Sequence, residues 1–310
     1  MATVLWILLG LAALLLAAGL IITAAALGRR GDDPLSPGAI AGSCWSKHSQ
    51  QVLAGAAWLA RQPTEEVTVT SFDGLQLFAR LLPAERCRGV LLLFHGYHSA
   101  AQVDFSCAAQ FYHELGFDLL LVDQRAHGHS QGRFLTLGVR ERRDCQTWAE
   151  FCHRRYGDGM PLFLAGLSMG ATTVLMASDL PLPPTVRGVL ADCGFTSPRD
   201  ILCHLLRTRY HLPTYPLLWA VGLWCRVLAG FGLSECSTVD SVARTGLPIQ
   251  LIHGGADWFV PCEMSRRAAE ACTGECHLLV VPEAGHGASF LVDRPAYMAA
   301  VRSFLESHLL

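Results

Sequence analysis

A serine flanked by glycines is the first group in this chain that could do covalent chemistry. Gly166-Leu167-Ser168-Met169-Gly170 joins a short apolar run to an apolar segment of helix length. A G-x-S-x-G turn between strand and helix forms a nucleophile elbow, because the glycines leave room for a sharp reversal of the chain. The N–H of Met169 would then lie at a helix N-terminus, where negative charge is stabilised. The alternative is a small-residue junction without a catalytic role.

The groups needed to activate this serine follow it in the chain. Asp257 comes directly after an apolar run, and His286 lies in a glycine-flanked loop after the next run. A serine hydroxyl is a weak nucleophile until an imidazole takes its proton, and a buried carboxylate fixes the tautomer of that imidazole. We therefore predict Ser168 as nucleophile, His286 as general base and Asp257 as the orienting acid. Asp192, at the end of a neighbouring run, is the competing acid.

An earlier turn, His95-Gly96-Tyr97-His98, could supply a second hydrogen-bond donor to an oxyanion. Gly96 lets the backbone direct its N–H groups inward, and the expected donors are the N–H groups of Tyr97 and Met169. We interpret His95 as a structural residue of the turn. For His98, a structural and a functional role both remain open.

Short apolar runs alternate with helix-length segments over most of the chain. This rhythm predicts an α/β fold built from βαβ units, with a mostly parallel sheet buried on both faces. The turn signal Phe72-Asp73-Gly74 predicts an opening hairpin. The other expected strands are 89–94, 117–122, 161–165, 186–191, 248–252 and 277–281.

The N-terminal segment has the properties of a membrane anchor. Residues 3–27 carry no charged side chain, and as a helix they would span roughly 37 Å, more than the ~30 Å hydrocarbon layer. We predict a single-pass anchor over residues 1–30. A cleaved secretory signal is the alternative, although the apolar stretch is longer than a signal core and no Lys or Arg precedes it. Arg29-Arg30 follow it and favour a cytoplasmic catalytic domain, while Asp32 and Asp33 count for little under the positive-inside rule.

Composition limits the function classes. The chain has 310 residues, 51% of them apolar, which suits one catalytic domain with appendages. A net charge of -2 gives no basic field for a nucleic-acid partner. Twelve cysteines are scattered without C-x-x-C pairs, so no zinc module is indicated, while disulfides remain open.

Two segments flank or interrupt the predicted hydrolase domain, which covers residues 65–310. Residues 31–64 are expected to form a juxtamembrane linker and a short helix. Residues 198–235 are expected to form a helical cap rich in aromatic side chains. These side chains could line an acyl pocket, pack the cap onto the sheet or lie against the bilayer; they are Tyr210, Tyr215, Trp219, Trp224 and Phe231.

Taken in order, these motifs resemble those of the α/β-hydrolase superfamily, in its monoacylglycerol-lipase-like and serine-aminopeptidase-like branch with small membrane-anchored bacterial members. The resemblance covers nearly all of residues 65–310 and includes the segments 123–132 and 191–197. Ala126 departs from it, since relatives often have Gly at that position. The resemblance implies an α/β-hydrolase fold of about eight strands with a cap.

The predicted activity is cleavage of carboxylic ester or thioester bonds of lipid-like acyl substrates through an acyl-enzyme intermediate. The alternatives are a catalytically silent relative that binds a ligand or partner at the membrane, and a peptidase of the same fold. No cofactor or metal is expected, because Asp123, His127 and His129 lack a metal-ligand spacing and a dinucleotide-binding glycine fingerprint is absent.

Overall fold

An eight-stranded sheet forms the centre of the computed structural model, which describes residues 1–31, 34, 36–41 and 44–309. Its strand order is β1-β2-β4-β3-β5-β6-β7-β8. β1 and β2 form an antiparallel hairpin, β2 pairs antiparallel with β4, and the remaining neighbours are parallel. The strands are β1 (Glu65–Thr70), β2 (Gln76–Leu82), β3 (Gly89–Phe94), β4 (Phe117–Asp123), β5 (Leu162–Leu167), β6 (Val186–Asp192), β7 (Ile249–Gly254) and β8 (Cys276–Val281).

This architecture confirms the predicted α/β-hydrolase fold. Strands β3, β4, β5 and β7 are buried along their whole lengths, as expected for parallel strands covered on both faces. Such strands are apolar at most positions instead of at every second one. The sequence shows them as continuous apolar runs for this reason.

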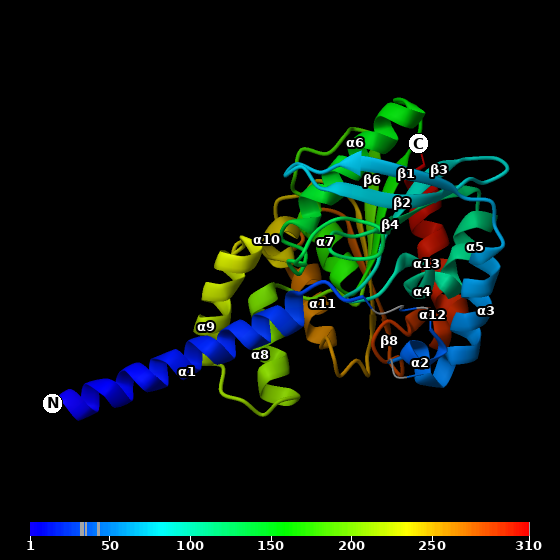
Figure 1. The fold of residues 1–310 in the computed structure, drawn as a ribbon. Coiled ribbons are helices and arrows are strands. Elements are labelled where there is room, and N and C mark those ends of the chain that lie inside the picture. Colours follow the sequence, from blue (N-terminus) through cyan, green and yellow to red (C-terminus); the bar gives the residue numbers. More distant parts are fainter. Residues whose placement is uncertain (32–33, 35, 42–43, 310) are drawn as a thin grey trace.

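Helices cover both faces of the sheet, as Figure 1 shows. One layer packs in a common core cluster and consists of α3 (Ser49–Ala60), α4 (Ala101–Asp104), α5 (Ser106–Glu114), α12 (Ser289–Val292) and α13 (Arg294–Ser307). The opposite layer consists of α6 (Glu141–Tyr156), α7 (Met169–Ala177), α10 (Thr238–Val242) and α11 (Cys262–Ala271).

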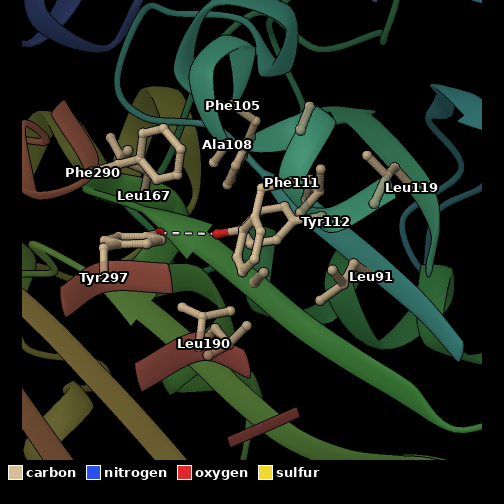
Figure 2. Close-up of a cluster of buried hydrophobic side chains, with 14 of the residues drawn as sticks. Leu91, Phe105, Ala108, Phe111, Tyr112, Leu119, Leu167, Leu190, Phe290 and Tyr297 are labelled. Atoms are coloured by element: carbon tan, nitrogen blue, oxygen red, sulfur yellow. Dashed lines mark hydrogen bonds between the residues drawn. The ribbon is translucent and has the colours of Figure 1, made fainter. Parts of the chain in front are cut away.

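The first of these layers buries two tyrosines whose hydroxyl groups form a hydrogen bond with each other (Figure 2). The hydroxyls of Tyr112 on α5 and Tyr297 on α13 lie 2.9 Å apart among Phe105, Phe290 and Leu190. Burial raises the pKa of both phenols above its usual value. The pair therefore stays neutral and links two helices across the core without an unpaired polar group.

The N-terminal helix α1 (Ala2–Leu27) projects away from the domain, with the N-terminus at its far end (Figure 1). Its mean hydropathy of 2.7 and its length make it the one helix among the described residues that could cross a membrane, a test that a signal sequence also passes. Only its C-terminal half contacts the domain, where Gly19, Thr23 and Leu27 are buried.

Residues 31–64, expected to form a juxtamembrane linker and a short helix, contain α3 where that helix was expected and a preceding stretch that packs on the domain. Ile40 on α2 (Pro37–Ala41) and Trp45 are buried in the core beside α3, which packs on α5. Isolated apolar residues in a Gly- and Pro-rich stretch anchor it to the domain. Asp32, Asp33 and Gly42 lie outside the described residues.

The predicted cap is helical. It comprises α8 (Pro198–Thr208), α9 (Leu217–Trp224) and one π-helical turn, η2 (Cys225–Ala229). Its buried side chains form a third core cluster with Leu27 of α1 and with Leu135 and Met169 of the domain. The cap thus packs against both the hydrolase domain and the N-terminal helix.

Candidate active site

Ser168 lies at the reversal between β5 and α7, in the conformation of a nucleophile elbow. Its φ of 56° and ψ of -114° are rare for a residue with a side chain. The flanking glycines explain how the turn closes: a Cβ on Gly166 would collide with the backbone of Gly170, and one on Gly170 would collide with the carbonyl group of Phe94. The local sequence therefore enforces the strained turn.

Three predicted residues from separate loops meet in one hydrogen-bonded chain. The Oγ of Ser168 lies 2.8 Å from Nε2 of His286, and Nδ1 of His286 lies 2.7 Å from Oδ2 of Asp257. The residues Ser168, His286 and Asp257 are 4%, 7% and 8% exposed. They come from the carboxyl ends of β5, β8 and β7, which lie at the same edge of the sheet. The contacts match those of a nucleophile, a general base and an orienting acid.

Asp257 is held as a carboxylate. Its Oδ1 accepts hydrogen bonds from the N–H groups of Phe259 and Val260, both at 2.9 Å. Burial by itself would raise the pKa of Asp257, but interactions with His253 and His286 hold that pKa well below its usual range. The negative charge can therefore fix the Nδ1–H tautomer of His286 and stabilise its protonated form.

Asp192, the competing acid, has a different position. Its side chain is buried with Oδ1 unpaired, and burial raises its pKa to about 7. Its backbone carbonyl accepts the N–H of Ser168 at 2.8 Å. Asp192 thus supports the elbow through its backbone, while Asp257 holds the imidazole.

The turn after β3 lies against Ser168. This position is required if the N–H of Tyr97 in the turn is to bind an oxyanion formed at the serine. A Cβ on Gly96 would be 3.3 Å from Cβ of Ser168. The half-buried Asp104 accepts the N–H of Gly96 at 2.5 Å and also accepts a hydrogen bond from the hydroxyl of Ser99. Burial raises the pKa of Asp104 to about 6. Among the described residues, no partner engages the N–H of Tyr97 or of Met169, so both are available to an oxyanion.

The other histidines near the site have structural partners. His95 donates from Nδ1 to the carbonyl of Gly96 and accepts the N–H of Gln124 at Nε2. His127 bonds the carbonyl of Arg125 and accepts the N–H of His98. His98 donates from Nε2 to the carbonyl of Ala26 at 3.1 Å and also lines the cavity beside Ser168.

The loop 123–132 supports the turn after β3, because His127 in this loop accepts the N–H of His98. Arg125 is buried and pairs with Asp144 at 2.6 Å and with Asp73 at 2.9 Å. Ala126 has a φ of 61°, in the left-handed region. This explains why relatives often have Gly at this position, because glycine adopts that conformation without strain.

Ser168 and His286 open into a cavity of about 560 Å³. Sequence reasoning missed most of its walls, which include Cys44, Trp45, Arg209, Trp258 and Phe259. The indole of Trp45 donates to the carbonyl of His286 at 3.1 Å, and the ring of Phe259 meets the imidazole edge-on. Phe259 could have been predicted as a wall of the cavity, because it lies two residues after Asp257 in the sequence. Nothing in the sequence around Trp45 indicates that it lines the cavity.

The expectation that the cap aromatics line an acyl pocket is wrong for the five residues named. None of them lines this cavity, to which the cap contributes Arg209. Phe231 is buried, and Trp224 bonds α1. Tyr210, Tyr215 and Trp219 are 60%, 80% and 59% exposed. Of the alternatives that the sequence left open, packing of the cap onto the domain holds for Phe231.

One potential metal-ligand group occurs among the described residues, namely Cys193, Asp257 and His286, whose ligand atoms lie within 4.8 Å of one another. Two of these three side chains already belong to the Ser168 chain of hydrogen bonds. A metal bound here would take His286 away from Ser168, so these side chains cannot hold a metal and form that hydrogen-bonded chain at the same time.

Comparisons with known proteins agree with this geometry. Residues 85–209 match the family described as serine aminopeptidase, S33. The chain is 26% identical over 194 residues to the Bacillus subtilis protein YqkD, covering 63% of this chain and 64% of that protein. It is 28% identical over 138 residues to caffeoylshikimate esterase of Arabidopsis thaliana, covering 43% of this chain and 40% of that enzyme. The chain therefore spans less than two thirds of the length of these curated relatives.

Among solved structures, the Pyrococcus furiosus esterase Pf2001 superposes with a TM-score of 0.65 at 21% identity, over 80% of this chain and 94% of that one. The chain therefore has the α/β-hydrolase fold. Within it, the chain is similar to the serine-aminopeptidase-like and monoacylglycerol-lipase-like branch, a group of hydrolases.

Proposed function

We propose that the protein is a serine hydrolase that cleaves carboxylic esters of apolar acyl groups, with residues 3–27 as its membrane anchor and its catalytic domain in the cytoplasm. The hydrogen-bonded chain from Ser168 through His286 to Asp257 carries the proposal. Ser168 acts as nucleophile, His286 as general base and acid, and Asp257 as the group that orients and stabilises the imidazole.

In the acylation step, Nε2 of His286 takes the hydroxyl proton while Oγ of Ser168 attacks the ester carbonyl carbon. The carbonyl electron pair moves onto oxygen, and the N–H groups of Tyr97 and Met169 stabilise that oxyanion. When the carbonyl re-forms, the bond to the alcohol oxygen breaks. The leaving alkoxide takes the proton from His286, which leaves an acyl ester on Ser168.

Deacylation repeats the sequence with water as nucleophile. His286 takes a proton from water, the hydroxide attacks the acyl carbon, and the same N–H groups stabilise the second oxyanion. Collapse releases the carboxylic acid and returns the proton to Oγ of Ser168. Every proton moves through one imidazole, so the reaction needs no other titrating group.

The cavity favours an acyl ester over a peptide with a free N-terminus. An aminopeptidase needs an anionic group to bind the substrate ammonium, and Asp104 is the one carboxylate among the described residues that line the cavity. Its oxygens already accept bonds from Gly96 and Ser99. Arg30 and Arg209 line the same cavity and would repel an ammonium. Apolar side chains such as Val103, Leu167 and Phe259 suit an acyl chain.

A fluorophosphonate probe tests the proposal, because it reacts with an activated serine. The full-length protein in detergent should be labelled, with the label on Ser168, and should hydrolyse p-nitrophenyl butyrate. Ser168→Ala should lose both properties while keeping its circular dichroism spectrum. Equal labelling of the alanine variant would show that another residue is the nucleophile. An unlabelled, folded wild-type protein would point to a catalytically silent relative.

A further inference from the structure

The junction between α1 and the cap contains contacts suited to a lipid environment. The indole N–H of Trp224 donates to the carbonyl of Leu16 at 2.8 Å, and Thr23 bonds the carbonyl of Val221 at 3.4 Å. A Cβ on Gly19 would lie 2.8 Å from Cβ of Ala220, so the two helices approach closely. Small residues and polar bonds between helices are the contacts that associate helices where no water is present.

The length of α1 sets a constraint on the cap. Residues 1–14 are fully exposed, and the first buried residue is Gly19. At about 1.5 Å per residue, residues 2–14 span roughly 20 Å, which is about 10 Å short of the hydrocarbon core of a bilayer. A spanning α1 must therefore bring the next seven or so residues into the hydrocarbon, and these residues pack on α9.

The cap surface next to this junction is apolar and exposed. Residues 210–225 contain no Asp, Glu, Lys or Arg, while Arg209 and Arg226 border the stretch. We call its exposed side chains the cap apex: Tyr210, Leu212, Tyr215, Trp219, Leu223 and Val227, which are between 37% and 80% exposed. Trp and Tyr are enriched at membrane interfaces, and arginine side chains beside them can reach the headgroups.

We propose that the cap apex is inserted in the bilayer beside α1, so that the protein holds the membrane with two elements instead of one. The cap apex is continuous with the exposed apolar surface of α1, so we infer that the same lipid bilayer covers both surfaces. This inference rests on the proposed anchor and goes beyond it, because an anchor alone requires no contact between cap and membrane. It also brings the Arg209 side of the active-site cavity close to the membrane surface.

The test uses the full-length protein in phosphatidylcholine liposomes that contain a phosphatidylcholine with a diazirine on its acyl chain. After irradiation, peptides are mapped by mass spectrometry. Label should appear on residues 3–14 and also on residues 210–227. Val227 and Val292 form a matched pair, being 63% and 40% exposed, and the peptide containing Val292 should carry at least about tenfold less label because it faces water.

A paired substitution gives a second readout. Trp219→Glu with Leu223→Glu should reduce cap labelling about tenfold, because carboxylates are unfavourable in hydrocarbon, and should leave α1 labelling unchanged. Fluorophosphonate labelling of Ser168 checks that the variant folds. Label on α1 without label on residues 210–227 of the wild-type protein overturns the inference and leaves the anchor standing. A mature chain that begins near Leu27 overturns both, while the esterase proposal stays separately measurable.

Discussion

The loops that carry Ser168, His286 and Asp257 and the cap that stands beside them are stabilised in opposite ways. Each triad side chain is nearly buried and has directional hydrogen bonds that fix its position. The cap apex has large exposed apolar side chains, and the cap is held by apolar packing against the domain and α1. The comparison shows that hydrogen bonds fix the side chains of Ser168, His286 and Asp257, whereas the cap leaves apolar side chains exposed and contributes Arg209 to the cavity.

The largest effect should follow from changing the acid of the triad. Asp257→Asn should lower kcat by about 10⁴-fold, because an amide favours the wrong imidazole tautomer. Asp192→Asn should change kcat by less than about tenfold, since Asp192 supports the elbow through its backbone carbonyl. Steady-state hydrolysis of p-nitrophenyl butyrate measures both. The reverse ranking would make Asp192 the acid.

The half-buried carboxyl of Asp104, bonded to the turn after β3, should make stability depend on pH. The pKa of Asp104 is raised from 3.8 to about 6 by burial, so its contribution is fully present below pH 4 and is lost as the pH rises through 6. Between pH 4 and pH 7 the unfolding free energy of the wild type should fall relative to Asp104→Asn by on the order of 3 kcal/mol.

Denaturant titrations of both proteins in the same detergent measure this difference. A gap in unfolding free energy that stays constant over that range would show that Asp104 ionises normally.

Truncation of α1 should separate anchoring from catalysis. Deletion of residues 2–14 removes only exposed residues and should keep kcat/KM within about twofold on a soluble ester. Deletion of residues 2–30 also removes Ala26, whose carbonyl accepts bonds from Tyr97 and His98. Because this loosens the turn with an oxyanion donor, kcat should fall by about 10²-fold. Equal activity of the two truncated proteins would show that the turn holds its position unaided.

The smallest effect concerns the acyl chain. Each methylene buried in the cavity contributes about 0.8 kcal/mol, so kcat/KM should rise about fourfold per carbon from acetate until the cavity is filled. Phe259→Ala should flatten this profile, while Trp219→Ala, a cap residue outside the cavity, should leave it unchanged. Measurements use acetate, butyrate and octanoate esters below their micelle concentrations. A steady decline from acetate in the wild type would reject an acyl pocket.

The parts of the fold and site that local sequence determines could be predicted. Buried parallel strands are continuous apolar runs, and the elbow is a five-residue motif whose glycines have no substitute. Asp257 and His286 were found because each follows a recognisable strand. The structure places these side chains together as expected, and their catalytic roles remain the proposal above.

The walls of the cavity and the packing of the cap could not be predicted, because they depend on contacts between residues far apart in the chain. Trp45 bonds the carbonyl of a residue 241 positions later, and Trp224 bonds one 208 positions earlier. Composition indicated that residues 198–235 were apolar, but could not say that α1 would cover part of them. A Gly- and Pro-rich stretch likewise gave no reason to expect that Trp45 would be buried.

The end of α1 has a consequence for protein engineering. The hydroxyl of Tyr97 reaches the carbonyl of Ala26 at 2.6 Å, and His98 shares the same acceptor. A chimaera that carries a foreign membrane helix would therefore have to preserve the helical phase at this position. One inserted residue rotates the carbonyl by about 100° around the helix axis, away from both donors. The C-terminal half of α1 is therefore not interchangeable with another helix, and a graft would have to end upstream of Gly19, which packs on Ala220.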